Sequence, residues 1–188
     1  MTNGARIRSA LESISHGEFM LTAASGRRSN GVLVDFVGQC ANDPPMLVIA
    51  TAKGQVLTPL IRDSRCFVVS VITDATRPLA RRFSRSNVET EDPFIGLPTE
   101  TTPRGIPILA RTSSWFECEL VRHFDIDADC ELYVGTVENV HVTTQMEREY
   151  EQLIPDTHPI STAPNCKPQP HMRNKKMARS RSVLAESS

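Results

Sequence analysis

Six stretches of the chain are rich in apolar and β-branched residues and are bounded by Gly, Pro, Asn or Asp, which is the pattern of β-strands. The predicted strands are residues 18–24, 32–37, 46–51, 66–72, 113–122 and 131–141. The strand–helix–strand alternation of parallel sheets is absent from the pattern. We therefore expect a mainly β fold, a six-stranded antiparallel β-barrel with peripheral helices, because closure leaves few strand edges exposed.

Three short segments have the apolar spacing of helices. Residues 4–15 place Ile7, Leu11 and Ile14 on one face, with Asn3 before them as a candidate N-cap. The other helices are expected over residues 55–62 and from Asp74 or Thr76 onward.

Turn residues divide these elements. The dipeptide Asn30-Gly31 favours positive φ, so residues 25–31 are predicted to form a hairpin turn. A pair of prolines at 44 and 45 breaks the pattern before the third strand. Residues 86–111 contain four prolines and predict a long irregular excursion, of the kind that forms lids, binding loops or subunit contacts.

Length and composition indicate one globular domain. The 188 residues are 39% hydrophobic and 23% charged, as in ordinary globular proteins. The main domain is expected over residues 1–150, and residues 151–188 read as a C-terminal extension that ends in a disordered basic tail. A solvated terminus and a nucleic-acid contact are both open for that tail, but a net charge of −1 gives no overall attraction to nucleic acid.

The remaining composition bears on location. Apolar runs are too short to cross a membrane, and the first residues lack the apolar core of a signal peptide. Five cysteines are scattered without a Cys-x-x-Cys pair, so neither a disulfide framework nor a metal site is expected. We expect a cytoplasmic protein.

One stretch has the composition of a ligand site. The strand 46–51 leads into Thr51-Ala52-Lys53-Gly54-Gln55, where small side chains surround a single cation. Small residues let a ligand approach the backbone, and free amides beside a Lys suit a phosphate. The alternative is that Lys53 is a solvated turn residue.

The ordered series of segments resembles the flavin reductase-like FMN-binding family, which adopts a split β-barrel. The resemblance covers roughly residues 10–142. Its motifs are Leu21-Thr22-Ala23, Asn30-Gly31 to Val37, Asp43-Pro44-Pro45, Lys53-Gly54-Gln55, Phe67-Val68-Val69-Ser70, Gly105-Ile106-Pro107-Ile108-Leu109, Trp115-Phe116-Glu117-Cys118 and Val134-Gly135-Thr136-Val137. The segment Phe36 to Cys40 is most similar to the flavin-reductase domains of diflavin flavoproteins.

The resemblance implies a flavin site built from two stretches. A loop from Val32 to Phe36 would give backbone hydrogen bonds to the ring, and the Lys53 turn would hold the ribityl and phosphate end. The implied cofactor-binding residues are Asn30, Val32, Leu33, Val34, Asp35, Phe36, Gln39, Cys40, Thr51, Ala52, Lys53, Gly54, Gln55 and Arg82. Purely structural roles are the alternative to cofactor binding. Gln39 and Cys40 could fill the end of a strand, and Arg82 could lie on a solvated helix face.

One departure from the family pattern concerns catalysis. Many members carry Gly-Asp-His before the last strand, and that His is associated with nicotinamide and flavin binding. The matching positions here are Ala128, Asp129 and Cys130. The catalytic residues are therefore unassigned. His123 and Cys130 are the candidates, against the alternatives of an exposed strand-end His and an inert thiol.

These implications define the functional hypotheses. The first is an oxidoreductase that binds FMN, in preference to FAD, and transfers hydride from NAD(P)H to flavin. The second is a flavin-binding electron-relay protein without reductase activity, and the third is a non-catalytic split-barrel interaction module. The resemblance also implies a homodimer.

Overall fold

The computed structural model describes residues 2–84, 92–144 and 148 of the chain. The expected extension over residues 151–188, with its basic tail, lies outside the described residues.

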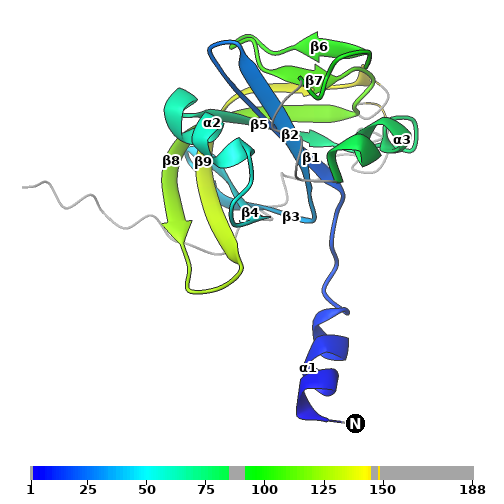
Figure 1. Ribbon diagram of the computed structural model, residues 1–188, viewed down its shortest axis with the longest axis vertical. Helices are drawn as coiled ribbons and strands as arrows, with labels where there is room; N and C mark the ends of the chain where they lie inside the picture. The colour runs from blue at the N-terminus through cyan, green and yellow to red at the C-terminus, as the bar shows by residue number, and fades with distance from the viewer. Residues whose placement is uncertain (1, 85–91, 145–147, 149–188) are drawn as a thin grey trace, which may run out of the picture.

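The described chain forms one large antiparallel sheet with short helices around it (Figure 1). Seven strands pair in the order β2-β1-β5-β8-β9-β4-β3, and β6 and β7 form a separate two-stranded sheet. The strands are β1 Phe19–Ser25, β2 Arg28–Val34, β3 Phe36–Asn42, β4 Pro45–Ala52, β5 Cys66–Val71, β6 Thr99–Thr101, β7 Pro107–Leu109, β8 Ser114–Asp125 and β9 Cys130–Val142. The helices are α1 Asn3–Leu11, α2 Leu57–Ser64 and α3 Arg77–Ala80, with the 3-10 helix η1 at Arg81–Ser84.

The connection between β2 and β3 determines the shape of the sheet. These strands follow one another in sequence with only Asp35 between them, yet they lie at opposite edges of the sheet. A flat sheet cannot satisfy that connection, so the sheet curls until its two edges meet at Asp35. The two edges do not pair with each other, and the result is an open, or split, barrel. The predicted mainly β, antiparallel fold is confirmed, but the main sheet has seven strands rather than the expected six, and it does not close.

The barrel encloses one apolar core, and its outer face carries two more clusters. Side chains from β1, β2, β4, β5, β8, β9 and one face of α2 fill the interior, where Leu21, Ile49, Ile61 and Phe67 are fully buried. On the other face of β1, Met20 packs with Phe83 and Phe94. Alternation along the strands therefore buries both faces of β1 and β5, which is why these strands read as continuous apolar runs.

Two local predictions are wrong. The strand expected at 32–37 is divided at Asp35, and residues 38–42, which lie outside every predicted strand, belong to β3. A hairpin does form within the predicted residues 25–31, but its turn is Gly26-Arg27, with Gly26 at φ 62°, and not Asn30-Gly31, which lie inside β2 opposite Ala23 and Thr22. A Cβ on Gly31 would lie 2.6 Å from Met20 Cε. This glycine therefore serves close packing rather than a turn.

The helix α1 forms where the spacing predicted it but ends earlier, at Leu11. Its N-cap is Thr2 rather than Asn3, and no side chain caps it. Figure 1 shows α1 standing away from the sheet at the end of an extended segment. Its apolar residues Ile7 and Leu11 are accordingly 54% and 55% exposed.

The described part of the Pro-rich excursion is a packed cover rather than a loose loop. Ile106 and Ile108 from β7 and its approach bury against Cys66 and Val68 of β5. Beneath this cover Glu117 is fully buried on β8. Its carboxylate accepts hydrogen bonds from the Thr102 hydroxyl, the Arg104 amide at 3.2 Å and Asn139 Nδ2 at 2.7 Å.

Gly135 provides a stability test of the barrel. A Cβ at this position on β9 would meet Phe67 Cζ at 2.6 Å and Cys118 Cβ at 2.9 Å, and both residues are fully buried. We expect Gly135→Ala to lower the free energy of unfolding by about 1–3 kcal/mol, the usual cost of overpacking. Urea denaturation measures it. The matched control is Gly38→Ala on β3, where the nearest atom, Val48 Cγ1, lies 3.8 Å away; equal losses in both variants would contradict the prediction.

Candidate functional site

The strand β3 forms a free edge of the described sheet. It pairs with β4 on one side, and its other backbone edge has no strand partner among the described residues. A bulge between Gln39 and Ala41 leaves Cys40 out of the pairing register. Phe36 is 45% exposed, and Gln39 Nε2 donates to Asn42 Oδ1 at 2.7 Å. This edge offers an aromatic side chain and backbone hydrogen-bonding groups to a ligand.

The residues before this edge are not the loop that the resemblance implied. Val32 and Val34 are core residues of β2, and Leu33 packs on the opposite face beside Met20 and Phe83. The expectation of a loop from Val32 to Phe36 is therefore wrong. Side chains alternate along β2, so Val32 and Val34 pack in the barrel core and Leu33 packs in the cluster on the opposite face. Asp35 and Phe36 are the exposed members of the stretch. Asn30 is half-buried, and its Oδ1 accepts from the Gly31 amide at 2.7 Å.

The turn after β4 is open to solvent. Thr51 is buried, whereas Ala52, Lys53 and Gly54 are exposed and Gln55 is half-buried. Gly54 has φ 76°, and no other atom lies within 4 Å of the position a Cβ would take. A positive φ suits glycine, and the open space lets a ligand reach the backbone of this turn. The helix α2 begins two residues later, at Leu57.

Lys53 joins this turn to the hairpin between β8 and β9. Its amide donates to the Asp129 carbonyl at 3.0 Å, and its ammonium group donates to the Ile126 carbonyl at 2.6 Å. The ammonium also forms an ion pair with Asp125. The hydrogen bond from Lys53, and then its charge, hold the pKa of the Asp125 carboxyl below its usual value.

A polar network lies beside this turn. Glu131 on β9 is 6% exposed, and its Oε1 accepts from Thr58 Oγ1 at 2.6 Å and from the Tyr133 hydroxyl at 2.9 Å. His123 Nε2 lies 2.8 Å from Glu131 Oε2, and the His123 ring stacks on Tyr133 with centroids 4.8 Å apart. The network connects the first turn of α2 to β8 and β9.

The network shifts the pKa values of its members. Burial raises the pKa of Glu131, but hydrogen bonds from Thr58, Tyr133 and His123 outweigh it, so the pKa lies below its usual value. Burial is also the main reason that the pKa of Tyr133 is raised. Sequence reasoning missed Glu131, Thr58 and Tyr133. The available signal was a glutamate at an inward position of a buried strand, since such a carboxylate needs donors nearby.

Residues 11–156 match the family model described as "Flavin reductase like domain". This chain belongs to that family. The expected family resemblance is therefore confirmed, and it extends beyond the residues 10–142 on which the motifs lie.

Curated relatives of this flavin reductase-like domain include longer proteins. A putative diflavin flavoprotein A 3 of Nostoc sp. is 32% identical over 123 residues, which are 65% of this chain and 21% of that protein. The high molecular weight rubredoxin of Moorella thermoacetica is 29% identical over 161 residues, 82% of this chain and 69% of that protein. The chain thus spans about a fifth of the length of the diflavin relatives it matches.

Solved structures share the fold. An NADH:FAD oxidoreductase of Streptomyces globisporus superposes with a TM-score of 0.66 at 18% identity, over 75% of this chain and 83% of that one. An FMN-binding protein of Thermus thermophilus gives a TM-score of 0.63 at 19% identity, over 69% of this chain and 73% of that one.

The two catalytic candidates of this flavin reductase-like domain have different surroundings. Cys130 is half-buried and pairs with Ala52, so it directly adjoins the Lys53 turn. Burial, and then Asp129, raise the pKa of its thiol, which keeps it protonated and poorly nucleophilic near neutral pH. His123 lies on β8 within the Glu131 network, and its side chain is 39% exposed.

The remaining implied cation, Arg82, has a different partner. It lies on η1, and its guanidinium donates to the Ile95 carbonyl at 3.0 Å, before β6. The structure thus brings Lys53 together with Cys130, His123 and the β8–β9 hairpin, and it gives Arg82 a role in holding the described part of the excursion.

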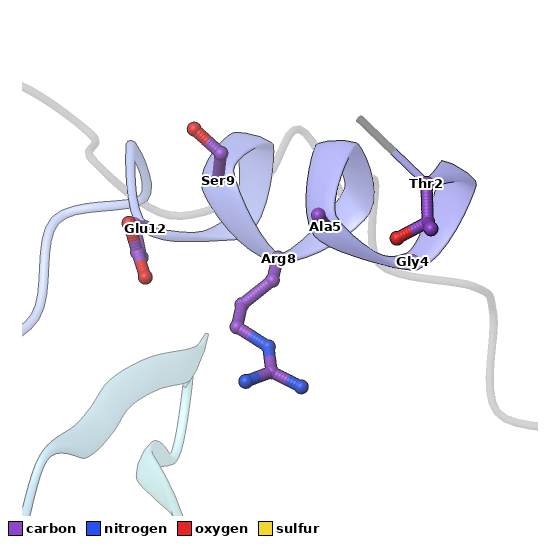
Figure 2. A pocket seen from close by; sticks show the side chains of 6 residues that line it. All are labelled: Thr2, Gly4, Ala5, Arg8, Ser9 and Glu12. Atoms are coloured by element: carbon purple, nitrogen blue, oxygen red, sulfur yellow. The ribbon is translucent and has the colours of Figure 1, made fainter.

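A surface hollow elsewhere is not a competing site. Figure 2 shows that its walls come only from residues 2–12, along one face of α1 and the residues flanking it. Its lining residues are Thr2, Gly4, Ala5, Arg8, Ser9 and Glu12. A hollow with no opposing wall cannot enclose a ligand in the way that small-molecule sites do.

The residues that the structure describes contain neither a membrane-spanning helix nor a metal-binding cluster. In this part of the chain, no helix is both long and apolar enough to span a membrane. Within the same residues, no group of three or more His, Cys, Asp or Glu side chains is arranged to hold a metal ion.

Glu131 gives a pH-dependent prediction. Its folded-state pKa is below the ordinary value of 4.5, so its ionised form stabilises the fold above that pH, and this stabilisation is lost as pH falls through the lowered pKa. We expect Glu131→Gln to cost about 1–3 kcal/mol at neutral pH, since hydrogen bonds to a charge are lost.

The difference between wild type and Glu131→Gln should shrink as the pH falls below about 4.5. Urea unfolding midpoints at a series of pH values measure it. The control is Glu100→Gln, an exposed glutamate on β6. A gap between wild type and Glu131→Gln that stays constant with pH would refute the assignment.

Proposed function

We propose that this chain is an FMN-binding, flavin reductase-like oxidoreductase that accepts hydride from NAD(P)H. The observation that carries the proposal is the family match over residues 11–156, together with the Lys53 turn that follows β4, the strand paired with β3. When bound, the flavin supplies the redox chemistry, and the protein supplies binding and orientation.

The residues present suit a flavin mononucleotide. The free edge of β3 carries backbone donors and acceptors for the polar edge of a flat ring, and the exposed Phe36 offers it an aromatic surface. Lys53 and the open amides around Gly54 suit a phosphate, because a charge-assisted contact combines with backbone donors there. One cation in a small turn fits one phosphate, which favours FMN over FAD.

Cys130 supports a second candidate function. It stands where many family members carry a His associated with nicotinamide binding, and its thiol is protonated near neutral pH. This observation favours a flavin-binding electron-relay protein that reacts slowly with NAD(P)H. Both versions share the same flavin site.

The assembly and location remain part of the proposal. We infer a homodimer in a reducing, cytoplasmic environment. The homodimer is what the resemblance to the family implies. The four described cysteines are free, which agrees with a reducing environment.

The flavin site predicts tight and visible FMN binding. Protein purified and mixed with FMN should retain a yellow colour after gel filtration, and the flavin released on denaturation should be FMN. We expect Phe36→Ala to weaken FMN binding about fivefold, which corresponds to about 1 kcal/mol of aromatic contact. Val140→Ala, which truncates an exposed apolar residue of β9, is the control. If the wild-type protein fails to bind added FMN, the proposed function is wrong.

Replacing Cys130 by His is expected to improve the use of NADH or NADPH. Restoring the family's His by Cys130→His should lower the KM for NADH or NADPH about fivefold, as expected for one added neutral hydrogen bond of about 1 kcal/mol. Steady-state oxidation of NADH and NADPH with FMN present measures this, with Cys130→Ser as the control. Flavin that binds but is reduced by neither nucleotide, in wild type and in Cys130→His alike, would favour the electron-relay function over the reductase.

A further inference from the structure

Lys53 is anchored to an acidic hairpin tip. Two backbone contacts fix its position, from its amide to the Asp129 carbonyl at 3.0 Å and from its ammonium to the Ile126 carbonyl at 2.6 Å. Asp125 then completes an ion pair with the ammonium. Because the lysine is held by main-chain atoms, its closeness to Asp125 is built into the hairpin rather than left to a flexible side chain.

The hydrogen-bond donors of the Lys53 ammonium group are largely occupied before a ligand binds. An ammonium group has three donors and no acceptor. One donor serves the Ile126 carbonyl and one serves Asp125, which leaves one without a partner among the described residues. An incoming phosphate therefore meets a lysine whose charge is already matched by a carboxylate.

The surroundings reinforce this competition. Asp127 and Asp129 lie in the same tip and are exposed, so the described hairpin tip sets three aspartates against the single Lys53. Of these, Asp125 makes the direct ion pair, and its side chain is 71% exposed. It can rotate into water when another anion takes its place, because no other described side chain except Lys53 pairs with it.

We propose that Asp125 competes with the flavin phosphate for Lys53 and so limits how strongly the site prefers FMN over unphosphorylated riboflavin. This inference rests on the proposed function and names the residue that sets its ligand specificity. Asp125 is a positioning residue for Lys53 in the free protein and an opposing charge once a phosphate arrives. Removing its charge strengthens binding of the phosphorylated ligand alone, since riboflavin lacks the group that competes.

The test is a fluorescence titration of wild type and Asp125→Asn with FMN and with riboflavin. Exposed ion pairs change equilibria about two- to fivefold, so the Kd for FMN should fall by about that factor in Asp125→Asn while the Kd for riboflavin stays unchanged. The gain should be larger at low salt, because screening weakens contacts between exposed charges.

Two matched variants separate competition from a general charge effect. Asp127→Asn removes a charge from the same hairpin tip without touching Lys53, and it should change FMN binding less than Asp125→Asn. Lys53→Met should abolish the gain, so that Asp125→Asn has no effect on FMN binding in the double variant. Asp125→Ser is a second form of the test, and far-ultraviolet circular dichroism checks that each variant is folded.

The outcomes divide clearly. Equal effects on FMN and riboflavin, weaker FMN binding in Asp125→Asn, or a gain that persists without Lys53 would each overturn the inference. Wild type that binds FMN while Asp125→Asn and Asp125→Ser leave its Kd unchanged overturns this inference and leaves the proposed function standing. Wild type that binds neither flavin overturns both.

Discussion

The passage of the chain from one edge of the sheet to the other is the constraint on which the structure depends. Asp35 alone separates β2 from β3, and these strands lie at opposite ends of the seven-strand order. Since one residue spans less than 4 Å, the sheet has to curl until its ends come together. The enclosed core, with Leu21, Ile49 and Phe67, follows from that curl, and apolar burial then stabilises it.

The same constraint places the candidate site. The two sheet edges meet at Asp35 without pairing β2 to β3, so β3 has a free edge within the described residues. Its partner β4 leads into the Lys53 turn, and β9, paired with β4, brings Cys130 against Ala52. The Glu131 network then ties α2 to the β8–β9 hairpin. Residues far apart in sequence meet here because three neighbouring strands end or turn at one end of the barrel.

Periodicity and turn chemistry predicted the fold class, most strands, the positions of the helices and the turn that carries Lys53. These sequence patterns gave wrong predictions where tertiary packing determines the local structure. Gly31 looked like a turn glycine, yet it lies inside β2, close to the side chains of Met20 and Phe83. Residues 38–42 lie outside every predicted strand because they lack an apolar pattern, and none of them is fully buried; backbone pairing with β4 makes them part of β3. The inward position of Glu131 could be recognised in the sequence, but its partner Thr58 could not, because 73 positions separate the two residues.

The bulge at Cys40 has a consequence for how this protein behaves in solution. A free edge strand is a template on which a second chain can add its own strand, and long regular edges of that kind lead to aggregation. The irregularity between Gln39 and Ala41 interrupts the regular spacing of backbone donors and acceptors along β3. Within the described residues, the regular stretches on either side of the bulge are short, which disfavours extended pairing with another molecule.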